Sequence, residues 1–167
     1  MDYENIILGT SNYEKAKSGN LVSITGDGGV SWNYYGKYYK KLAPRLVTYE
    51  KYVEGLKNLK NIKDKDEYQT YKNYIEYEYI KSYYETRLLS LNINELLEIL
   101  YKKFGNDIIL LCHESIDEFC HRRVLADFIE LETGIYIPEV SIDESQNLTK
   151  ENPIRYKKIL NRVINEE

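Results

Sequence analysis

Cysteine and histidine are scarce in this chain of 167 residues, and acidic residues outnumber basic ones. It contains two cysteines and two histidines, and its net charge of −4 corresponds to a pI near 5.4. Small secreted proteins usually carry a dense disulfide framework, whereas two cysteines favour reduced thiols in the cytoplasm. Domains that bind nucleic acid are usually basic, so the acidic balance argues against nucleic acid as a partner.

Long apolar runs and targeting signals are also missing. No apolar stretch approaches the roughly 18 residues that a membrane span requires, and no secretory leader is recognisable. We therefore expect a cytoplasmic protein with no membrane partner. With 43% hydrophobic residues, the chain is long enough for one core and too short for two ordinary domains, which predicts a single domain over residues 1–167.

The familiar nucleotide-binding loops are absent as well. The glycine-rich stretch 26–29 matches neither the dinucleotide fingerprint nor the lysine-bearing phosphate loop, and a structural turn explains it better than a phosphate site. The dense aromatic residues of 30–39 could stack on a base or cover the core. Arg45 is a candidate anion contact, although an ordinary surface charge is the simpler interpretation. The sequence identifies no cofactor.

The segment 106–134 carries the most informative pattern and holds both cysteines and both histidines. Ile108 to Leu111 is a short apolar run, typical of a strand buried on both faces. Apolar residues then recur at helical spacing from Val124 to Leu131. Because ligands of α/β sheets bind beyond the carboxyl ends of the strands, this strand, turn and helix predict a functional site.

The remaining apolar patterns complete an α/β fold. Strands are expected near residues 5–9, 21–25, 107–112 and possibly 135–139, helices near 47–59, 66–91, 93–104 and 153–164, and a polar loop over 141–151. Together they predict a three-layer Rossmann-like fold with a small, mostly parallel sheet and helices on both faces. The tyrosine stripe of the longest helix is expected in the core. Thr10 and Ser11 follow the first strand, where they could contact a ligand or precede a short helix over 13–17.

Metal binding is one chemistry open to the segment 106–134. Cys112, His113, Cys120 and His121 are residue types that bind zinc. Adjacent side chains point apart, so these four cannot easily share one ion, and we assign no metal site. A site made of Cys112 and Cys120 with one histidine or Glu114 remains an alternative.

Thiol chemistry is a second alternative. Cys120 is expected at the start of a helix beside Arg122, where positive potential lowers the pKa of a thiol. If Cys112 ends the neighbouring strand, the two sulfurs come close enough for a nucleophile and a resolving thiol, or for a reversible disulfide. Both cysteines could equally pack as small apolar groups.

Anion recognition is the third chemistry open to the segment 106–134. Free N–H groups at the start of the helix, together with His121 and Arg122, would form a cationic cradle for a phosphate or carboxylate. Arg123 is instead expected to pair with Asp127, one turn further along the helix.

The chain resembles an uncharacterised family, domain of unknown function 488, in two runs: Leu110-Leu111-Cys112-His113-Glu114 and Phe119-Cys120-His121-Arg122-Arg123. Two shorter stretches, Leu42-Ala43-Pro44 and Thr10-Ser11, also look like parts of that family, so the likeness covers about residues 5–140. It implies a Rossmann-like α/β fold and no particular activity. The site residues that the resemblance implies are Cys112, Glu114, Cys120, His121 and Arg122.

Taken together, these observations predict a pocket at the carboxyl ends of the strands for a small anionic, nucleotide-like or phosphorylated metabolite, which the protein could also process. The expected ligand contacts are Thr10, Ser11, His121 and Arg122, and the expected catalytic residues are Cys112, Glu114 and Cys120. Glu114 would act as a general base or orient the ligand. A non-enzymatic nucleotide-sensing or sequestering module is the alternative, and nucleic-acid processing is less favoured.

Overall fold

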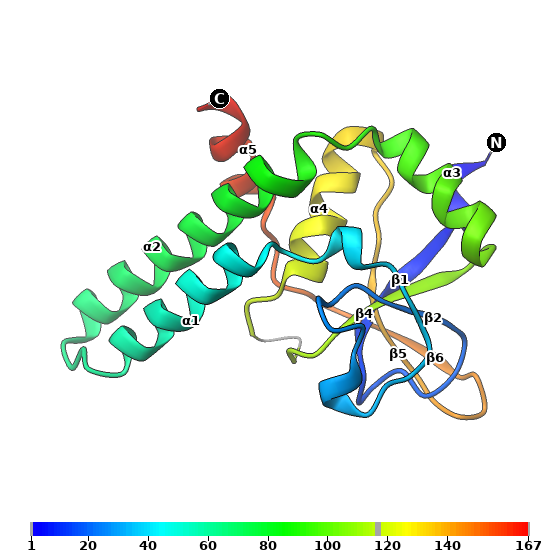
Figure 1. Cartoon of the computed structure of the whole chain (residues 1–167), viewed down its shortest axis with the longest axis horizontal. Coiled ribbons are helices and arrows are strands. Elements are labelled where there is room, and N and C mark those ends of the chain that lie inside the picture. The colour runs from blue at the N-terminus through cyan, green and yellow to red at the C-terminus, as the bar shows by residue number, and fades with distance from the viewer. Residues whose placement is uncertain (1, 116–117, 167) are drawn as a thin grey trace.

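Six strands form one sheet in the computed structural model, which describes residues 2–115 and 118–166 (Figure 1). The strands are β1 (Ile7–Asn12), β2 (Asn20–Ser23), β3 (Lys37–Tyr38), β4 (Ile108–Cys112), β5 (Glu139–Ile142) and β6 (Leu148–Glu151). Their order is β3-β2-β4-β1-β5-β6, and every pairing is parallel except β5 with β6. The predicted single-domain α/β fold with a mostly parallel sheet is confirmed.

The last two strands differ from the prediction. β5 begins at Glu139, where the strand predicted over 135–139 should have ended, and the predicted polar loop 141–151 contains the antiparallel partner β6. The first three residues of β6 are exposed and two of them are polar, so β6 has no alternation of apolar residues that would reveal an edge strand.

Five α-helices accompany the sheet: α1 (Leu46–Leu59), α2 (Lys65–Tyr83), α3 (Ile93–Phe104), α4 (His121–Thr133) and α5 (Lys157–Asn165). Their boundaries follow local signals. The side chains of Asp64 and Asn92 accept backbone hydrogen bonds at the starts of α2 and α3, and Gly105 and Gly134 follow the ends of α3 and α4 at positive φ. α1 and α2 form an antiparallel hairpin (Figure 1).

The structure differs from the prediction at two of the expected helices. The stretch 13–17 forms turns instead of a helix, with the Asn12 side chain accepting hydrogen bonds from the backbone N–H groups of Glu14 and Lys15. The terminal helix starts at Lys157, four residues later than expected. Among the residues that the structure describes, no helix is long and apolar enough to cross a membrane.

The two faces of the sheet are covered differently. One face packs against the larger apolar core, which includes residues of α2, α3, α4 and α5. The smaller cluster on the opposite face draws on strand residues and on Tyr13, Ala16 and Tyr34, and contains no residue of an α-helix. A helical layer is thus found on one face, whereas the prediction placed helices on both.

The direction of the chain explains this difference. From β2 to β4 and from β4 to β5 the chain moves along the sheet in one direction, so right-handed crossovers place α1 to α4 on the same face. The step from β1 to β2 runs in the opposite direction and therefore crosses the other face. That connection has only the residues 13–19 and is too short for a helix that spans the sheet.

The tyrosine-rich helix packs in the core as predicted. Tyr79 and Tyr83 are buried, and the Tyr83 hydroxyl donates a hydrogen bond to the Leu42 carbonyl at 2.5 Å. Phe119, directly before α4, lies edge-on against Tyr79 and Tyr156 with ring centroids 4.8 and 5.3 Å apart. This aromatic packing fixes the start of α4 at the carboxyl end of the sheet.

Candidate functional site

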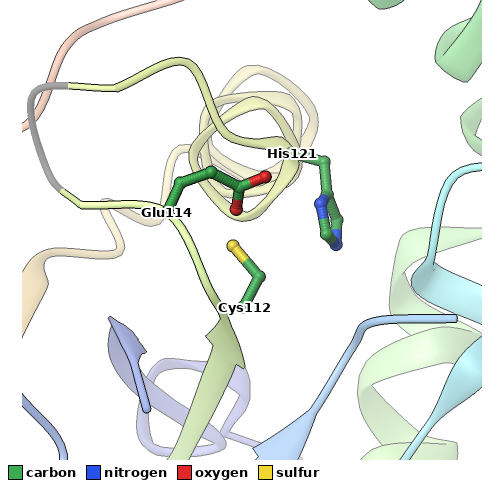
Figure 2. Close-up of side chains that lie close together, drawn as sticks. All are labelled: Cys112, Glu114 and His121. Atoms are coloured by element: carbon green, nitrogen blue, oxygen red, sulfur yellow. The ribbon is translucent and has the colours of Figure 1, made fainter. Parts of the chain in front are cut away.

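The end of β4 and the start of α4 bring the chemically active side chains together. Cys112 is the last residue of β4, Cys120 is the N-cap of α4, and His121 is the first helical residue. Figure 2 shows the carboxylate of Glu114 directed toward the Cys112 sulfur, with the His121 ring beside them. Five predicted site residues therefore share one region: Cys112, Glu114, Cys120, His121 and Arg122.

The two cysteines form a buried, reduced thiol pair. Both are buried and neither forms a disulfide. Burial raises the pKa of the Cys112 thiol well above its ordinary value, and a hydrogen bond with Cys120 adds to this effect. The same hydrogen bond lowers the pKa of Cys120, which burial opposes and the charge of Arg122 supports. Cys112 is thus the donor, and Cys120 is the sulfur that more readily carries negative charge.

Arg122 is fully buried, and each of its guanidinium nitrogens has a partner within the protein. Nε and Nη2 donate to the carboxylate of Glu139 at distances from 2.7 to 3.2 Å, while Nη1 lies 3.0 Å from the Cys112 sulfur and 2.9 Å from the Glu114 carbonyl. Burial opposes the charge, but the thiols and Glu139 raise the pKa of Arg122 above its ordinary value. Its contacts fix the arrangement of β4, Glu114 and β5.

The family model described as domain of unknown function DUF488 matches residues 36–129, which include this thiol pair and Arg122. The chain belongs to the DUF488 family. The predicted resemblance is thereby confirmed. Comparison with curated proteins and with solved structures gives no significant match.

Glu139 is a residue of this DUF488 chain that the sequence did not single out. Its carboxylate is completely buried and accepts hydrogen bonds from Thr10 at 2.6 Å and Lys15 at 2.9 Å in addition to those from Arg122. A carboxylate between the apolar residues Ile137 and Val140 was the available signal, because such a group requires buried partners. Those partners come from distant parts of the chain.

Glu139 should make the stability of the DUF488 domain depend on pH. Burial alone would raise the pKa of Glu139, but Arg122, Lys15 and Thr10 bring it below the ordinary 4.5. Its ionised form therefore stabilises the fold above about pH 4.5, and this contribution is lost as pH falls through the lower folded-state pKa. We expect urea unfolding midpoints to fall more steeply between about pH 6 and pH 3 in the wild type than in Glu139→Gln. If the urea midpoint depended on pH in the same way in both proteins, ionised Glu139 would not stabilise the fold.

Thr10 and Ser11 point into the protein. β1 extends to Asn12, so both residues lie within the strand and are fully buried. The Thr10 hydroxyl donates to Glu139 and accepts from Arg123 at 2.8 Å, and the Ser11 hydroxyl donates to the Val140 carbonyl at 2.7 Å. The structure thus places both side chains in contacts with β5 and α4.

Arg123 is also buried and only partly satisfied. Nη1 donates to Thr10 and to the Ile137 carbonyl, whereas Nε and Nη2 have no hydrogen-bond partner among the residues described. The expected ion pair with Asp127 is present at 3.9 Å. Asp127 also accepts shorter hydrogen bonds from Arg155 and from the Tyr156 backbone, at 3.1 and 2.5 Å.

A cleft of about 680 Å³ opens at the carboxyl ends of β2 and β4 and is lined by His113 and His121, whereas neither cysteine lines it. Its lining comes from four parts of the chain: the loop after β2, the segment before α1, the end of the α2 region and the starts of the loop and helix that follow β4. The charged and aromatic residues of the lining include Asp27, Trp32, Lys40, Arg87, His113 and His121. The sequence predicted His121 as a ligand contact, but it did not indicate Lys40 or Arg87 as site residues.

The cations at the cleft have no acidic partner in the described part of the chain. Lys40 and Arg87, which line the cleft, form no salt bridge among the described residues, and neither does Arg45, which is outside the lining. The Arg87 Nε donates to the Ala43 carbonyl at 2.8 Å, which anchors the side chain. Burial lowers the pKa of Arg87, and the nearby charge of Arg45 lowers it further. Arg87 therefore presents a positive charge to a cleft that is also lined by the carboxylate of Asp27.

The acidic and aromatic residues of the cleft have distinct environments. Hydrogen bonds from Ser31, through its side chain and its backbone, and from the Gly29 backbone and Thr25 hold the pKa of the Asp27 carboxyl well below its ordinary value, although burial opposes this effect. The glycine-rich stretch is thus organised as a turn around Asp27. Trp32 stacks on His113 with ring centroids 5.1 Å apart, and 52% of its surface stays exposed.

Proposed function

We propose that the cleft binds a small anionic ligand, either a nucleotide or a similar phosphorylated metabolite. The observation that carries the proposal is that Arg87, which forms no salt bridge with any residue that the structure describes, is held by the Ala43 carbonyl in the lining of a cleft that also includes Lys40. Guanidinium groups bind phosphates through paired, charge-assisted hydrogen bonds. Arg87 takes the role that the sequence suggested for Arg122, whose nitrogens are already occupied by protein groups.

Arg87 lies in a local distortion of the helix. The residues Tyr84–Leu88 form a π-helical turn after α2. Such turns are rare and occur frequently at functional sites, since one extra residue per turn changes the direction of the side chains. The placement of Arg87 in this turn supports a role in binding.

Trp32 supports the nucleotide form of the ligand. One face of its indole stacks on His113, yet half of the side chain is exposed at the cleft. Aromatic side chains at such positions bind bases by stacking, which contributes about 1–3 kcal/mol per base. A phosphate at Arg87 and a base at Trp32 would together account for both ends of a mononucleotide.

Calorimetric titration with a graded series of probes tests the proposal. We expect AMP to bind more tightly than inorganic phosphate, and phosphate to bind measurably, because AMP uses both the cations and Trp32. Adenosine lacks the phosphate and should bind most weakly. If adenosine bound as tightly as AMP, or if neither AMP nor phosphate bound, the cleft would not be an anion site.

Trp32→Ala should separate the two parts of the ligand. Without the stacking surface, AMP affinity is expected to fall about fivefold to 150-fold, since stacking contributes about 1–3 kcal/mol. Phosphate affinity should remain within about a factor of two, because phosphate does not use the indole. Tyr35→Ala is the matched control, an aromatic residue with 76% exposure that does not line the cleft. Equal losses for AMP and phosphate would rule out stacking on Trp32.

The thiol pair and Glu114 favour a reaction on the bound ligand over simple storage. His113 lines the cleft, and its Nε2 lies 3.2 Å from the Glu114 carboxylate, so a general base adjoins the proposed ligand. Turnover that disappears in Cys120→Ser would assign an enzyme with thiol chemistry. Recovery of AMP unchanged after long incubation would instead assign a sensing or sequestering module.

A further inference from the structure

Three side chains with different donor atoms converge at the end of β4. The Cys112 sulfur, a Glu114 carboxylate oxygen and a His121 ring nitrogen all lie within 4.8 Å of one another, and Figure 2 shows the group. We propose that Cys112, Glu114 and His121 bind one divalent transition-metal ion, and that Zn²⁺ fits this donor set best. The proposal rests on these residues alone and does not depend on anion binding in the cleft.

The chemistry of the donors selects the type of ion. Thiolate, imidazole and carboxylate are the ligands that zinc accepts, whereas Mg²⁺ and Ca²⁺ prefer oxygen alone. Bond lengths of about 2.0–2.3 Å in a tetrahedral site place ligand atoms about 3.3–3.7 Å apart. The present separations of up to 4.8 Å need to contract by up to about 1.5 Å, which rotations of the Glu114 and Cys112 side chains would have to supply.

Glu114 has an oxygen that needs a partner. Its Oε1 lies 3.2 Å from His113 Nε2, but its Oε2 is buried and has no hydrogen-bond partner in residues 2–115 and 118–166. A buried carboxylate oxygen without a partner is costly. A bound cation would satisfy it, and no other group in the described structure does so.

His121 has the orientation that metal-binding histidines commonly adopt. Its Nε2 lies 2.8 Å from the Ile24 carbonyl, which can only accept a hydrogen bond. Nε2 therefore carries the hydrogen, and Nδ1 keeps a free lone pair. A backbone carbonyl on the outer ring nitrogen is a usual second contact of zinc-binding histidines.

The charges around the group balance a divalent ion. Cys112 is a neutral thiol in the metal-free protein and would lose its proton on binding the ion, so that Cys112 and Glu114 would then supply two negative charges. Arg122 lies 3.0 Å from the Cys112 sulfur, but its own charge is neutralised by Glu139 at 2.7 Å. It can therefore donate a hydrogen bond to a metal-bound sulfur without leaving excess positive charge beside the ion.

The backbone that carries the proposed ligands is already held in place. The Glu114 carbonyl accepts hydrogen bonds from Arg122 at 2.9 Å and from the Asn12 side chain at 3.2 Å. Three protein ligands leave at least one position for water or substrate, as in catalytic zinc sites. His121 also lines the cleft, so that position would adjoin it.

Metal titration of the full chain tests the proposal. After treatment with a chelator and a thiol reductant, the wild type should bind one Zn²⁺ per chain in competition with a fluorescent zinc indicator. Co²⁺ should give a near-ultraviolet sulfur-to-cobalt charge-transfer band together with the visible bands of a tetrahedral site. Binding of less than half an equivalent of Zn²⁺, or a Co²⁺ spectrum without the sulfur band, would overturn the proposal.

The two cysteines provide a matched pair of variants. Cys112→Ser should abolish the charge-transfer band and weaken zinc binding by more than about a hundredfold, because even the loss of an outer partner costs about tenfold to a hundredfold. Cys120→Ser should retain the band and the stoichiometry, since Cys120 is outside the proposed set. The reverse result would assign the sulfur ligand to Cys120 and overturn the proposed site.

Glu114→Gln keeps the test decisive if Cys112→Ser does not fold. Glu114 is partly exposed and its replacement keeps the same shape, so the variant should fold. We expect at least tenfold weaker zinc binding than in the wild type, and unchanged zinc affinity would contradict the proposal. AMP binding to the metal-free protein is measured separately, so failure of the metal site and failure of the anion site give different results.

Discussion

Arg122→Met should lower the free energy of unfolding by about 3–5 kcal/mol, the largest effect that we expect from a single substitution in this chain. The substitution leaves the completely buried Glu139 with only Lys15 and Thr10 as partners. It also removes the donor that holds the Cys112 sulfur and the Glu114 carbonyl. Urea unfolding followed by circular dichroism measures the loss.

Arg123→Met provides the matched control for this prediction. Arg123 is the next residue, equally buried, but only its Nη1 has hydrogen-bond partners among the residues described. Asp127 would keep Arg155 and the Tyr156 backbone as partners. We expect a loss of less than about 2 kcal/mol, because little hydrogen bonding is removed. Equal losses in the two variants would mean that burial of an arginine, and not its pairing, determines the effect.

Arg87→Glu should weaken AMP binding by at least about a hundredfold. A hydrogen bond to a charged group contributes about 1.5–3 kcal/mol, the new carboxylate adds repulsion, and each 1.4 kcal/mol corresponds to about tenfold in affinity. Calorimetry at low and at moderate salt measures the change, and the salt dependence of binding should also become weaker in the variant.

The control for Arg87→Glu is Arg162→Glu. Arg162 lies on α5 with a side chain that is 66% exposed, and it is not part of the cleft. Arg162→Glu changes the net charge by the same amount as Arg87→Glu, so any general effect of charge on AMP binding appears in both variants. AMP affinity that falls equally in both would show that Arg87 makes no specific contact. Circular dichroism confirms that each variant is folded.

The sequence predicted the part of the site that is local in the chain. Ile108 to Leu111 is apolar because β4 lies in the middle of the sheet, and the apolar residues at helical spacing from Val124 to Leu131 do lie in α4. The pattern of strand, turn and helix also predicted that Cys112 and His121 lie at the carboxyl ends of the strands. Each of these statements depends on residues within one strand, turn and helix, where spacing alone carries the information.

The partners that come from distant segments could not be predicted in this way. Arg122 was expected to face a ligand, but Glu139 reaches it from β5, on the far side of β1 from β4. Thr10 was expected in a turn, but β1 continues to Asn12 and buries it. Arg87 enters the cleft from the end of a long helix whose sequence pattern indicates only core packing.

These findings divide the carboxyl end of the sheet into two neighbouring parts. The cleft presents Lys40 and Arg87, which form no salt bridge within residues 2–115 and 118–166, together with Asp27 and the half-exposed ring of Trp32. Behind His121 lie a thiol pair and a carboxylate oxygen that lacks a partner within the described structure. We propose the first part as the site of an anionic ligand and the second as the source of the groups that act on it.

The most direct test of the anion site is the fluorescence of Trp32, which is the only tryptophan in the chain. Titration with AMP should change its emission in a saturable way, and inorganic phosphate added afterwards should reverse the change by competing at Arg87. The same titration of Arg87→Glu should give no saturable change over that concentration range. A signal that stays linear in AMP, or one that persists unaltered in Arg87→Glu, would contradict the assignment of this cleft as the anion-binding site.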